Sequence, residues 1–182
     1  LGTTLRELLP VAWVGSLPAV VQLLLALVLA ELWAYGAHRL MHRSDFLWRF
    51  HAYHHSIAHM TWASARRQHP VDVVLIQACS NLPAFVLGVD LAPLAVFILG
   101  TRLYTVLLHT NIDLTYGPLD RVFASPRFHH WHHAADGTGT HHNFAGLFSL
   151  FDWLLGTWHP TAEAPLRLGN PTIPDSRHEP AA

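Results

Sequence analysis

Long apolar runs alternate with histidine-rich polar stretches along this chain of 182 residues. Residues 17–36 are almost entirely apolar, and this run is long enough for a helix that crosses a hydrocarbon core of ~30 Å. Residues 71–109 form a second and longer apolar region, which a glycine, an aspartate and a proline interrupt at positions 88–93. This pattern predicts a hairpin of two further helices, over residues 71–88 and 91–109.

The composition favours a membrane protein. Hydrophobic residues make up 51% of the chain and charged residues 13%, which is more apolar than a soluble domain of this size needs. The alternative is a hairpin buried in a soluble helical bundle, which the interruptions at Gln77, Asn81 and Pro83 would suit. The lengths of the apolar runs favour the bilayer.

Charge and cysteine content exclude several classes of protein. The formal net charge is −1 and the chain has no lysine, so it has no positive field to hold nucleic acid. Its single cysteine, Cys79, can form neither a disulfide framework nor a cysteine-ligated metal site. Any metal is therefore expected on nitrogen or oxygen ligands.

We expect one all-α, integral-membrane domain over residues 1–160, followed by an extended or mobile tail over 161–182. If the first apolar run crosses once and the hairpin crosses twice, residues 37–70 and 109–160 lie on one side, as a histidine-rich helical cap. That side carries seven arginines, against only Arg6 beyond the first span. The positive-inside rule therefore predicts a cytoplasmic cap.

Two charged residues lie within the predicted spans, where an ionisable group usually has a partner or a function. Glu31 lies seven residues before His38, and Arg102 lies seven residues before His109. Because both helices run toward the same face, both charges should lie roughly 10 Å below their histidines, at about 1.5 Å per residue. We expect an ion pair between Glu31 and Arg102.

Three histidine clusters follow the spans on the predicted cytoplasmic side. Their members are spaced three or four residues apart, so that each cluster shares one helical face. The clusters are His38 and His42; His51, His54 and His55; and His129, His132 and His133. Neutral imidazole suits iron, zinc, copper or nickel. A structural zinc site closes with about four ligands, whereas these imidazoles suffice for two ions with open positions, which favours a catalytic dinuclear centre.

The sequence around these histidines carries further distinctive stretches. They include W-R-F-H-A-Y-H-H-S from Trp48, H-P-V-D from His69 and S-P-R-F-H-H-W-H-H from Ser125. Together with the spacings H-x3-H and H-x2-H-H, these stretches resemble the fatty acid hydroxylase and sterol desaturase superfamily, in particular its bacterial members. The resemblance covers residues 30–160.

The resemblance implies a membrane oxygenase that holds two iron ions and oxidises an unactivated C–H bond of a lipid with molecular oxygen. The lipid would be a sterol, a fatty acyl chain or a related molecule, and the outcome hydroxylation or desaturation. Electrons would come from an external donor, such as a ferredoxin, a cytochrome b5-like protein or a reductase. Zinc can replace iron at such imidazole sites in a purified sample.

The resemblance also implies further residues at the site. It places a ninth ligand at His109. His142 and Asn143 are candidates for a ligand or for a residue that orients a ligand histidine. Asp152 is a candidate acceptor of a hydrogen bond from a ligand, and helix capping or pairing with an arginine is the alternative for it.

Two other functions compete with an oxygenase. A histidine-rich metal transporter would place its ligands inside the spans, whereas these clusters follow the spans. A zinc-dependent membrane hydrolase would need a carboxylate base beside the metal, as in H-E-x-x-H, and no cluster here contains a glutamate.

Overall fold

Helices form the whole framework of the described chain. The computed structural model describes residues 12–89, 91–137, 139–160 and 162–170. Within these ranges the structure contains α-helices and 3-10 helices and no β-strand. Its only β-type pairing there is one isolated antiparallel bridge. The all-α prediction is therefore confirmed for the part of the chain that the structure describes.

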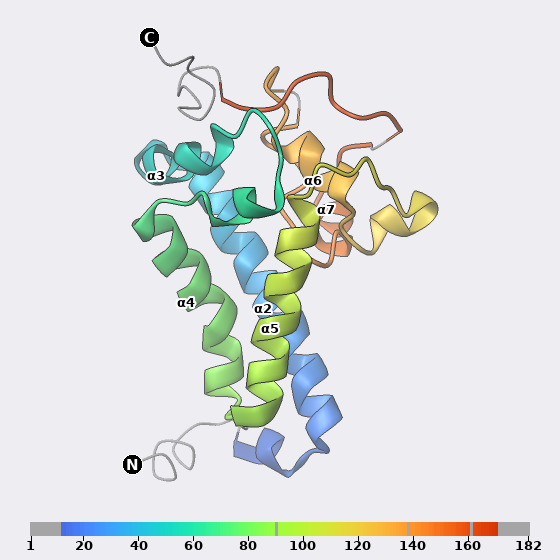
Figure 1. Ribbon diagram of the computed structural model, residues 1–182. Coiled ribbons are helices and arrows are strands. Elements are labelled where there is room, and N and C mark those ends of the chain that lie inside the picture. Colours follow the sequence, from blue (N-terminus) through green and yellow to red (C-terminus); the bar gives the residue numbers. More distant parts are fainter. Residues whose placement is uncertain (1–11, 90, 138, 161, 171–182) are drawn as a thin grey trace.

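Three long helices run side by side and form an elongated bundle (Figure 1). They are α2 (Ala19–Arg43), α4 (Pro70–Val86) and α5 (Leu91–Leu108). The bundle corresponds to the three predicted apolar segments. Of the described helices, only α2 has the length and the apolar composition to cross a membrane, and α4 and the Leu94–Leu108 part of α5 are shorter apolar helices.

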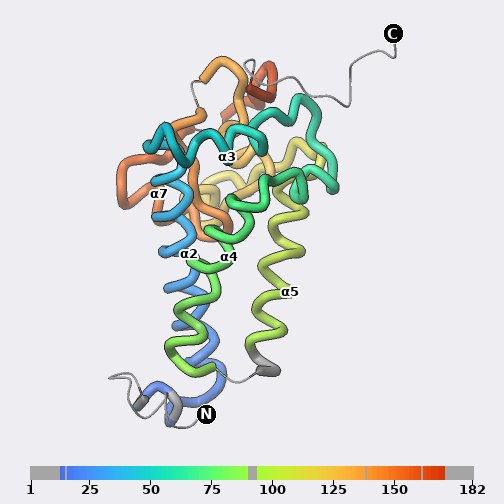
Figure 2. Tube along the Cα trace, turned by 90° about the vertical axis from the view of Figure 1, so that its left-hand side faces the viewer, coloured from blue at the N-terminus to red at the C-terminus, as the bar shows by residue number. Residues whose placement is uncertain are grey.

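The shorter elements gather at one end of the bundle, where α2 and α5 finish, and Figure 2 shows the same arrangement from the side. Of the short elements that the structure describes, the 3-10 turn η1 (Ala12–Ser16) alone lies at the opposite end. The elements of the gathered end are α3 (Asp45–His55), η2 (Trp62–Arg66), η3 (Gly117–Arg121), α6 (Pro126–His132) and α7 (Leu150–Leu154). They form the predicted helical cap, and its side of the membrane stays a prediction.

Helix α2 continues past the end of the predicted span at residue 36. It carries His38 and His42 on its last two turns and ends only at Arg43. Ser44 then turns the chain, because its backbone is extended and its side chain accepts a hydrogen bond from the N–H of Leu47 as the N-cap of α3. Two of the predicted ligands therefore stand on the same rigid helix as the apolar run.

The outward faces of the three long helices are apolar. Exposed large hydrophobic side chains include Val20, Leu24 and Val28 on α2, Val74 and Phe85 on α4, and Val96, Leu99 and Leu103 on α5. So many exposed large apolar side chains on neighbouring helices would be unfavourable in water, and they suit helices that face lipid. The surface supports the predicted bilayer environment over the soluble alternative.

A small buried core joins the bundle to the cap. It packs Tyr35 of α2, Leu108 of α5 and Phe128 of α6 against Phe144 and Ala145. The Tyr35 hydroxyl also forms a hydrogen bond of 2.8 Å with the hydroxyl of Thr157. Because the core contains residues from three helices and from the loop before α7, it fixes the position of the cap histidines relative to the bundle.

The predicted ion pair between Glu31 and Arg102 is not formed, and neither residue takes part in an ion pair among the described residues. The Glu31 carboxylate instead accepts a hydrogen bond of 2.6 Å from the N–H of Leu147. The loop before α7 packs beside α2 at this depth, so that a backbone donor reaches the carboxylate. Both charged residues line one cavity.

The tail is only partly within the described structure. Residues 161 and 171–182 lie outside the described residues, as does Arg6. Residues 162–170 contain no helix. The N–H of Ala135 donates to the carbonyl of Arg167, and the N–H of Gly169 donates to the carbonyl of His133. This part of the tail therefore pairs with the end of α6.

Candidate metal centre

The nine histidines predicted as ligands lie together where the bundle meets the cap, in two groups. The first group contains His38, His42, His51, His55 and His132, and the second contains His54, His109, His129 and His133. Within each group, one ring nitrogen from every residue lies within 4.8 Å of the others. All nine side chains are buried except that of His38, which is half-buried.

Each histidine trio divides between the two groups. On α3, His51 and His55 join the first group, whereas His54 joins the second. Successive residues of a helix are rotated by ~100°, so residues four apart point nearly the same way while adjacent residues diverge. On α6 the same rule sends His129 and His133 to one group and His132 to the other. The H-x2-H-H spacing thus lets one helix contribute to two neighbouring sites.

Hydrogen bonds at Nδ1 orient five of these rings. The Nδ1 atoms of four rings lie at 2.7 to 3.0 Å from backbone carbonyls: His38 with Phe144, His132 with His142, His54 with Arg67 and His109 with Thr105. In His51, Nδ1 lies 3.1 Å from a carboxylate oxygen of Asp72. These partners can only accept, so we assign the proton of each neutral ring to Nδ1, which leaves a lone pair on Nε2.

The lone pairs of these rings converge within each group. The Nε2 atom of His38 lies 2.9 Å from that of His51 and 3.0 Å from that of His132. In the second group, the Nε2 atoms of His54 and His109 are 3.2 Å apart. Two lone pairs at such a distance repel each other unless a cation lies between them. The donor set of each group therefore fits a metal ion.

Other ring nitrogens of the site have no hydrogen-bond partner although they are buried. These are both nitrogens of His42, both of His133, and Nδ1 of His129. A buried polar atom that stays unpaired costs about 1–3 kcal/mol, so several of them in one place require an explanation. Coordination of a metal ion by His42 and His133 provides one.

Burial also sets the charge of the cap histidines. It lowers the pKa of His54, His55, His129, His132 and His133 well below the usual range, and the neighbouring imidazoles lower it further. Removal from water disfavours the charged form, and adjacent rings that would both be positive repel each other. The rings are therefore neutral at physiological pH, which is the form that binds metals.

The structure adds one residue that sequence reasoning missed, Asp72. Its side chain is completely buried, and one of its carboxylate oxygens orients His51. Asp72 lies in the first turn of α4, where His69 is the N-cap and Pro70 is the first helical residue. A carboxylate is favourable at this end of a helix. The stretch H-P-V-D was visible in the sequence, but nothing local indicated that it faces His51.

We expect Asp72→Asn to weaken metal binding by about 10- to 100-fold, because a carboxylate behind a ligand imidazole fixes its orientation and raises its basicity. Competition between the protein and a chromogenic chelator for Fe(II), without oxygen, measures this change. Asp45→Asn is the matched control, since Asp45 is exposed and also stands in the first turn of a helix. Equal affinity of the two variants would contradict the role of Asp72.

The three additional candidates lie beside the groups and not within them. His142 contributes its backbone carbonyl to His132, and its ring belongs to neither group. The side-chain amide of Asn143 forms hydrogen bonds with the backbone: Nδ2 donates to the carbonyl of Phe128, and Oδ1 accepts from the N–H of His159. Its φ of 58° lies in the left-handed region, which asparagine tolerates.

Asp152 accepts hydrogen bonds from donors other than a histidine. Its carboxylate accepts from the N–H groups of Phe144 and Ala145, both at 2.8 Å, and from the hydroxyl of Thr157 at 2.7 Å. Burial raises the pKa of this carboxyl to about 6. Since the carbonyl of Phe144 holds His38, Asp152 positions that histidine through the backbone.

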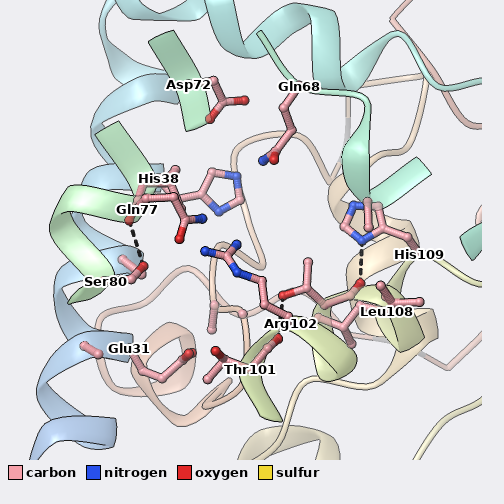
Figure 3. Close-up of a pocket in the computed structure, with 18 of the residues that line it drawn as sticks. Glu31, His38, Gln68, Asp72, Gln77, Ser80, Thr101, Arg102, Leu108 and His109 are labelled. Carbon is pink, nitrogen blue, oxygen red and sulfur yellow. Dashed lines mark hydrogen bonds between the residues drawn. The ribbon is translucent and has the colours of Figure 1, made fainter. Parts of the chain in front are cut away.

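A cavity of about 140 Å³ lies between the three long helices, directly beside the histidine groups (Figure 3). Five histidines from both groups line it, namely His38, His51, His54, His109 and His129. The rest of the wall comes from α2, α4 and α5, from residues 65–68 and from the loop before α7. A molecule in this cavity lies in direct contact with the histidines of both groups.

Comparison with known proteins shows the family of this chain. The sequence pattern of the fatty acid hydroxylase family matches residues 23–157, so the chain belongs to that family, as its motifs predicted. It is 39% identical to the ornithine lipid hydroxylase of Rhizobium tropici over 150 residues, which cover 81% of this chain and 44% of that protein.

Two further relatives have different named activities. The chain is 27% identical to the alkylglycerol monooxygenase of Homo sapiens, over 71% of this chain and 28% of that protein. It is 28% identical to a very-long-chain aldehyde decarbonylase of Oryza sativa subsp. indica, over 76% of this chain and 55% of that protein. The chain thus spans about half or less of the length of these curated relatives. No solved structure matches it.

Proposed function

We propose that this protein is an integral-membrane lipid oxygenase with two iron ions, one in each histidine group. The observation that carries the proposal is the convergence of Nε2 lone pairs in two adjacent buried groups, beside a cavity between apolar helices. The named activities of the relatives include a lipid hydroxylase and an alkylglycerol monooxygenase, which supports a lipid as the substrate.

Iron bound in the two groups would supply the activation of molecular oxygen. The reaction consumes one O2, two electrons and two protons for each lipid oxidised; hydroxylation releases one water molecule, and desaturation releases two. The residues of the chain hold the rings in position through Asp72 and four backbone carbonyls. Burial of the site excludes bulk water from the reaction. Electrons are proposed to come from an external donor, a ferredoxin, a cytochrome b5-like protein or a reductase.

We propose that α2, α4 and α5 each cross the membrane. Helices α4 and α5 contain 17 and 18 residues. At ~1.5 Å per residue each is about 26 Å long, close to the ~30 Å of a hydrocarbon core. Their exposed apolar faces support this arrangement. The arginines around the cap support a cytoplasmic metal centre under the positive-inside rule.

The arrangement favours an oxygenase over the alternative functions. Both histidine groups lie at one end of the bundle, whereas a transporter would need ligands along a path through it. The nine imidazoles also exceed what a mononuclear zinc hydrolase uses.

A direct test measures oxygen consumption by the full chain in detergent, after anaerobic loading with Fe(II). With reduced ferredoxin and a bacterial lipid extract, we expect lipid-dependent oxygen uptake. Mass spectrometry should then find a lipid heavier by one oxygen atom or lighter by two hydrogen atoms. The zinc-loaded chain is the control and should leave the extract unchanged. Iron in both groups without lipid-dependent oxygen uptake would overturn the proposal.

A further inference from the structure

We propose that Arg102 binds an anionic group, a carboxylate or a phosphate, on the head group of the lipid that enters the cavity. The inference rests on the proposed lipid oxygenase function and deepens it, because it names the class of substrate as an acidic or zwitterionic polar lipid. Neutral lipids such as sterols and alkylglycerols lack the group that Arg102 would hold.

Arg102 extends from α5 into the cavity, and Figure 3 shows its guanidinium group between the levels of Glu31 and His38. The same cavity is lined by histidines of both groups. A ligand that contacts the guanidinium group therefore lies next to the metal centre. This position distinguishes Arg102 from exposed arginines such as Arg43 and Arg49, which do not line the cavity.

The charge of Arg102 is not balanced by the described part of the chain. Its side chain makes no ion pair or hydrogen bond there, and the nearby Glu31 carboxylate is turned to the N–H of Leu147. Asp72, the other acid in the cavity wall, orients His51. A second cation, Arg66, also lines the cavity. A half-buried cation between apolar helices is costly without a partner, and an anionic ligand would supply one.

The chemistry of a guanidinium group specifies the ligand further. Its planar array of N–H donors matches two oxygens of a carboxylate or a phosphate at once, in a charge-assisted pair. An ether, a sterol hydroxyl or an alkyl chain presents no such pair of charged acceptors. Arg102 therefore favours an anion over a neutral polar group.

The α4 side of the cavity carries polar side chains, where an acyl tunnel would be apolar. Gln77, Ser80 and Asn81 line the cavity from one face of α4, at positions i, i+3 and i+4. The Oε1 atom of Gln77 is buried and has no hydrogen-bond partner. It is a free acceptor for an N–H or O–H group of the same head group, so the lining suits a ligand that has a donor as well as an anion.

The volume of the cavity fits a head group. Its volume of about 140 Å³ resembles that of cavities of ~150 Å³ that bind a molecule the size of benzene. A fragment of this size is comparable with a small amino-acid or phosphate head group, and is much smaller than a sterol ring system. The acyl chains would then lie outside the cavity, against the apolar helices.

The test is lipid binding by the iron-loaded full chain in detergent, kept without oxygen so that binding is measured apart from turnover. Three probes with matched acyl or alkyl chains are compared by native mass spectrometry: an acyl-ornithine with a free carboxylate, a phosphatidic acid, and a neutral alkylglycerol. We expect the unaltered protein to bind at least one of the two anionic probes about 10- to 100-fold more tightly than the neutral one. The two anionic arms distinguish a carboxylate from a phosphate ligand.

Variants then assign this preference to Arg102. Arg102→Met removes the charge but retains length and should lose the preference for anions, Arg102→Lys should retain part of it, and Arg49→Met, at an exposed position, should retain all of it. Bound iron verifies that each variant is folded. Equal binding of all three probes by the unaltered protein would overturn the inference without any variant, as would an unchanged preference in Arg102→Met.

The outcomes separate this inference from the proposed function. If neutral lipids are oxidised as readily as acidic ones, the role of Arg102 is refuted and the oxygenase stands. If anionic lipids bind through Arg102 but no lipid is oxidised, the oxygenase is refuted and the binding site stands.

Discussion

Replacing either His42 or His133 with alanine is expected to reduce the iron content from about two ions per chain to about one, and to abolish lipid oxidation. The two residues belong to different groups, and both nitrogens of each ring are buried without a hydrogen-bond partner. Each substitution therefore removes a ligand from one group and disturbs no hydrogen bond elsewhere. The double variant His42→Ala/His133→Ala is expected to lose both ions.

Elemental analysis of the protein in detergent measures the iron content, and oxygen uptake with lipid measures the activity. The control is His59→Ala, because His59 is an exposed histidine outside both groups. The control should retain both ions and the activity. An unchanged iron content in the His42 and His133 variants would refute the assignment of the two groups as metal sites.

The second large effect is expected for Asp152→Ala, which should lower the free energy of unfolding by about 3 kcal/mol or more. The substitution leaves the N–H groups of Phe144 and Ala145 and the hydroxyl of Thr157 without their acceptor. Each unpaired buried donor costs about 1–3 kcal/mol. Since the carbonyl of Phe144 orients His38, iron binding in the first group should weaken as well.

Thermal unfolding in detergent, followed by the fluorescence of the half-buried Trp48, Trp131 and Trp158, measures the loss of stability. Asp152→Asn should have an intermediate effect. The amide oxygen can still accept from one of the two backbone N–H groups, whereas the amide NH2 group is a donor and faces the other N–H group without an acceptor between them. Asp113→Ala is the control, because it removes the carboxylate of the Asp113–Arg127 ion pair. Asp113 is exposed, and such a surface ion pair contributes about 1 kcal/mol or less to stability. Equal unfolding temperatures for Asp152→Ala and Asp113→Ala would contradict the role of Asp152.

The clustering of the histidines follows from helical periodicity, and for this reason the sequence predicts it well. Positions three and four apart share a face, so His51, His54 and His55 had to point roughly one way once α3 formed. The apolar runs likewise predict the long helices, although α2 extends to Arg43 and carries His38 with it. The division of each trio between two groups depends on which neighbouring helices its members meet.

The partners of the buried polar groups were not predictable in the same way. Glu31 bonds to Leu147, which is 116 positions away, and His51 bonds to Asp72 on a different helix. Such contacts depend on how deeply one element packs against another, and a hydrophobic pattern does not specify this depth. The predicted ion pair between Glu31 and Arg102 is not formed, because similar depth in the bundle is not sufficient. The two side chains must also point toward each other.

The sequence by itself determined the helices, the histidine faces and the family, since these follow from local periodicity and from short distinctive stretches. Only the tertiary structure decided how the nine histidines divide into two groups, which carboxylate stands behind His51, and that Arg102 faces a cavity. The physical reason is that these features require atoms far apart in the chain to meet within about 3 Å, a tolerance that packing of the whole fold sets.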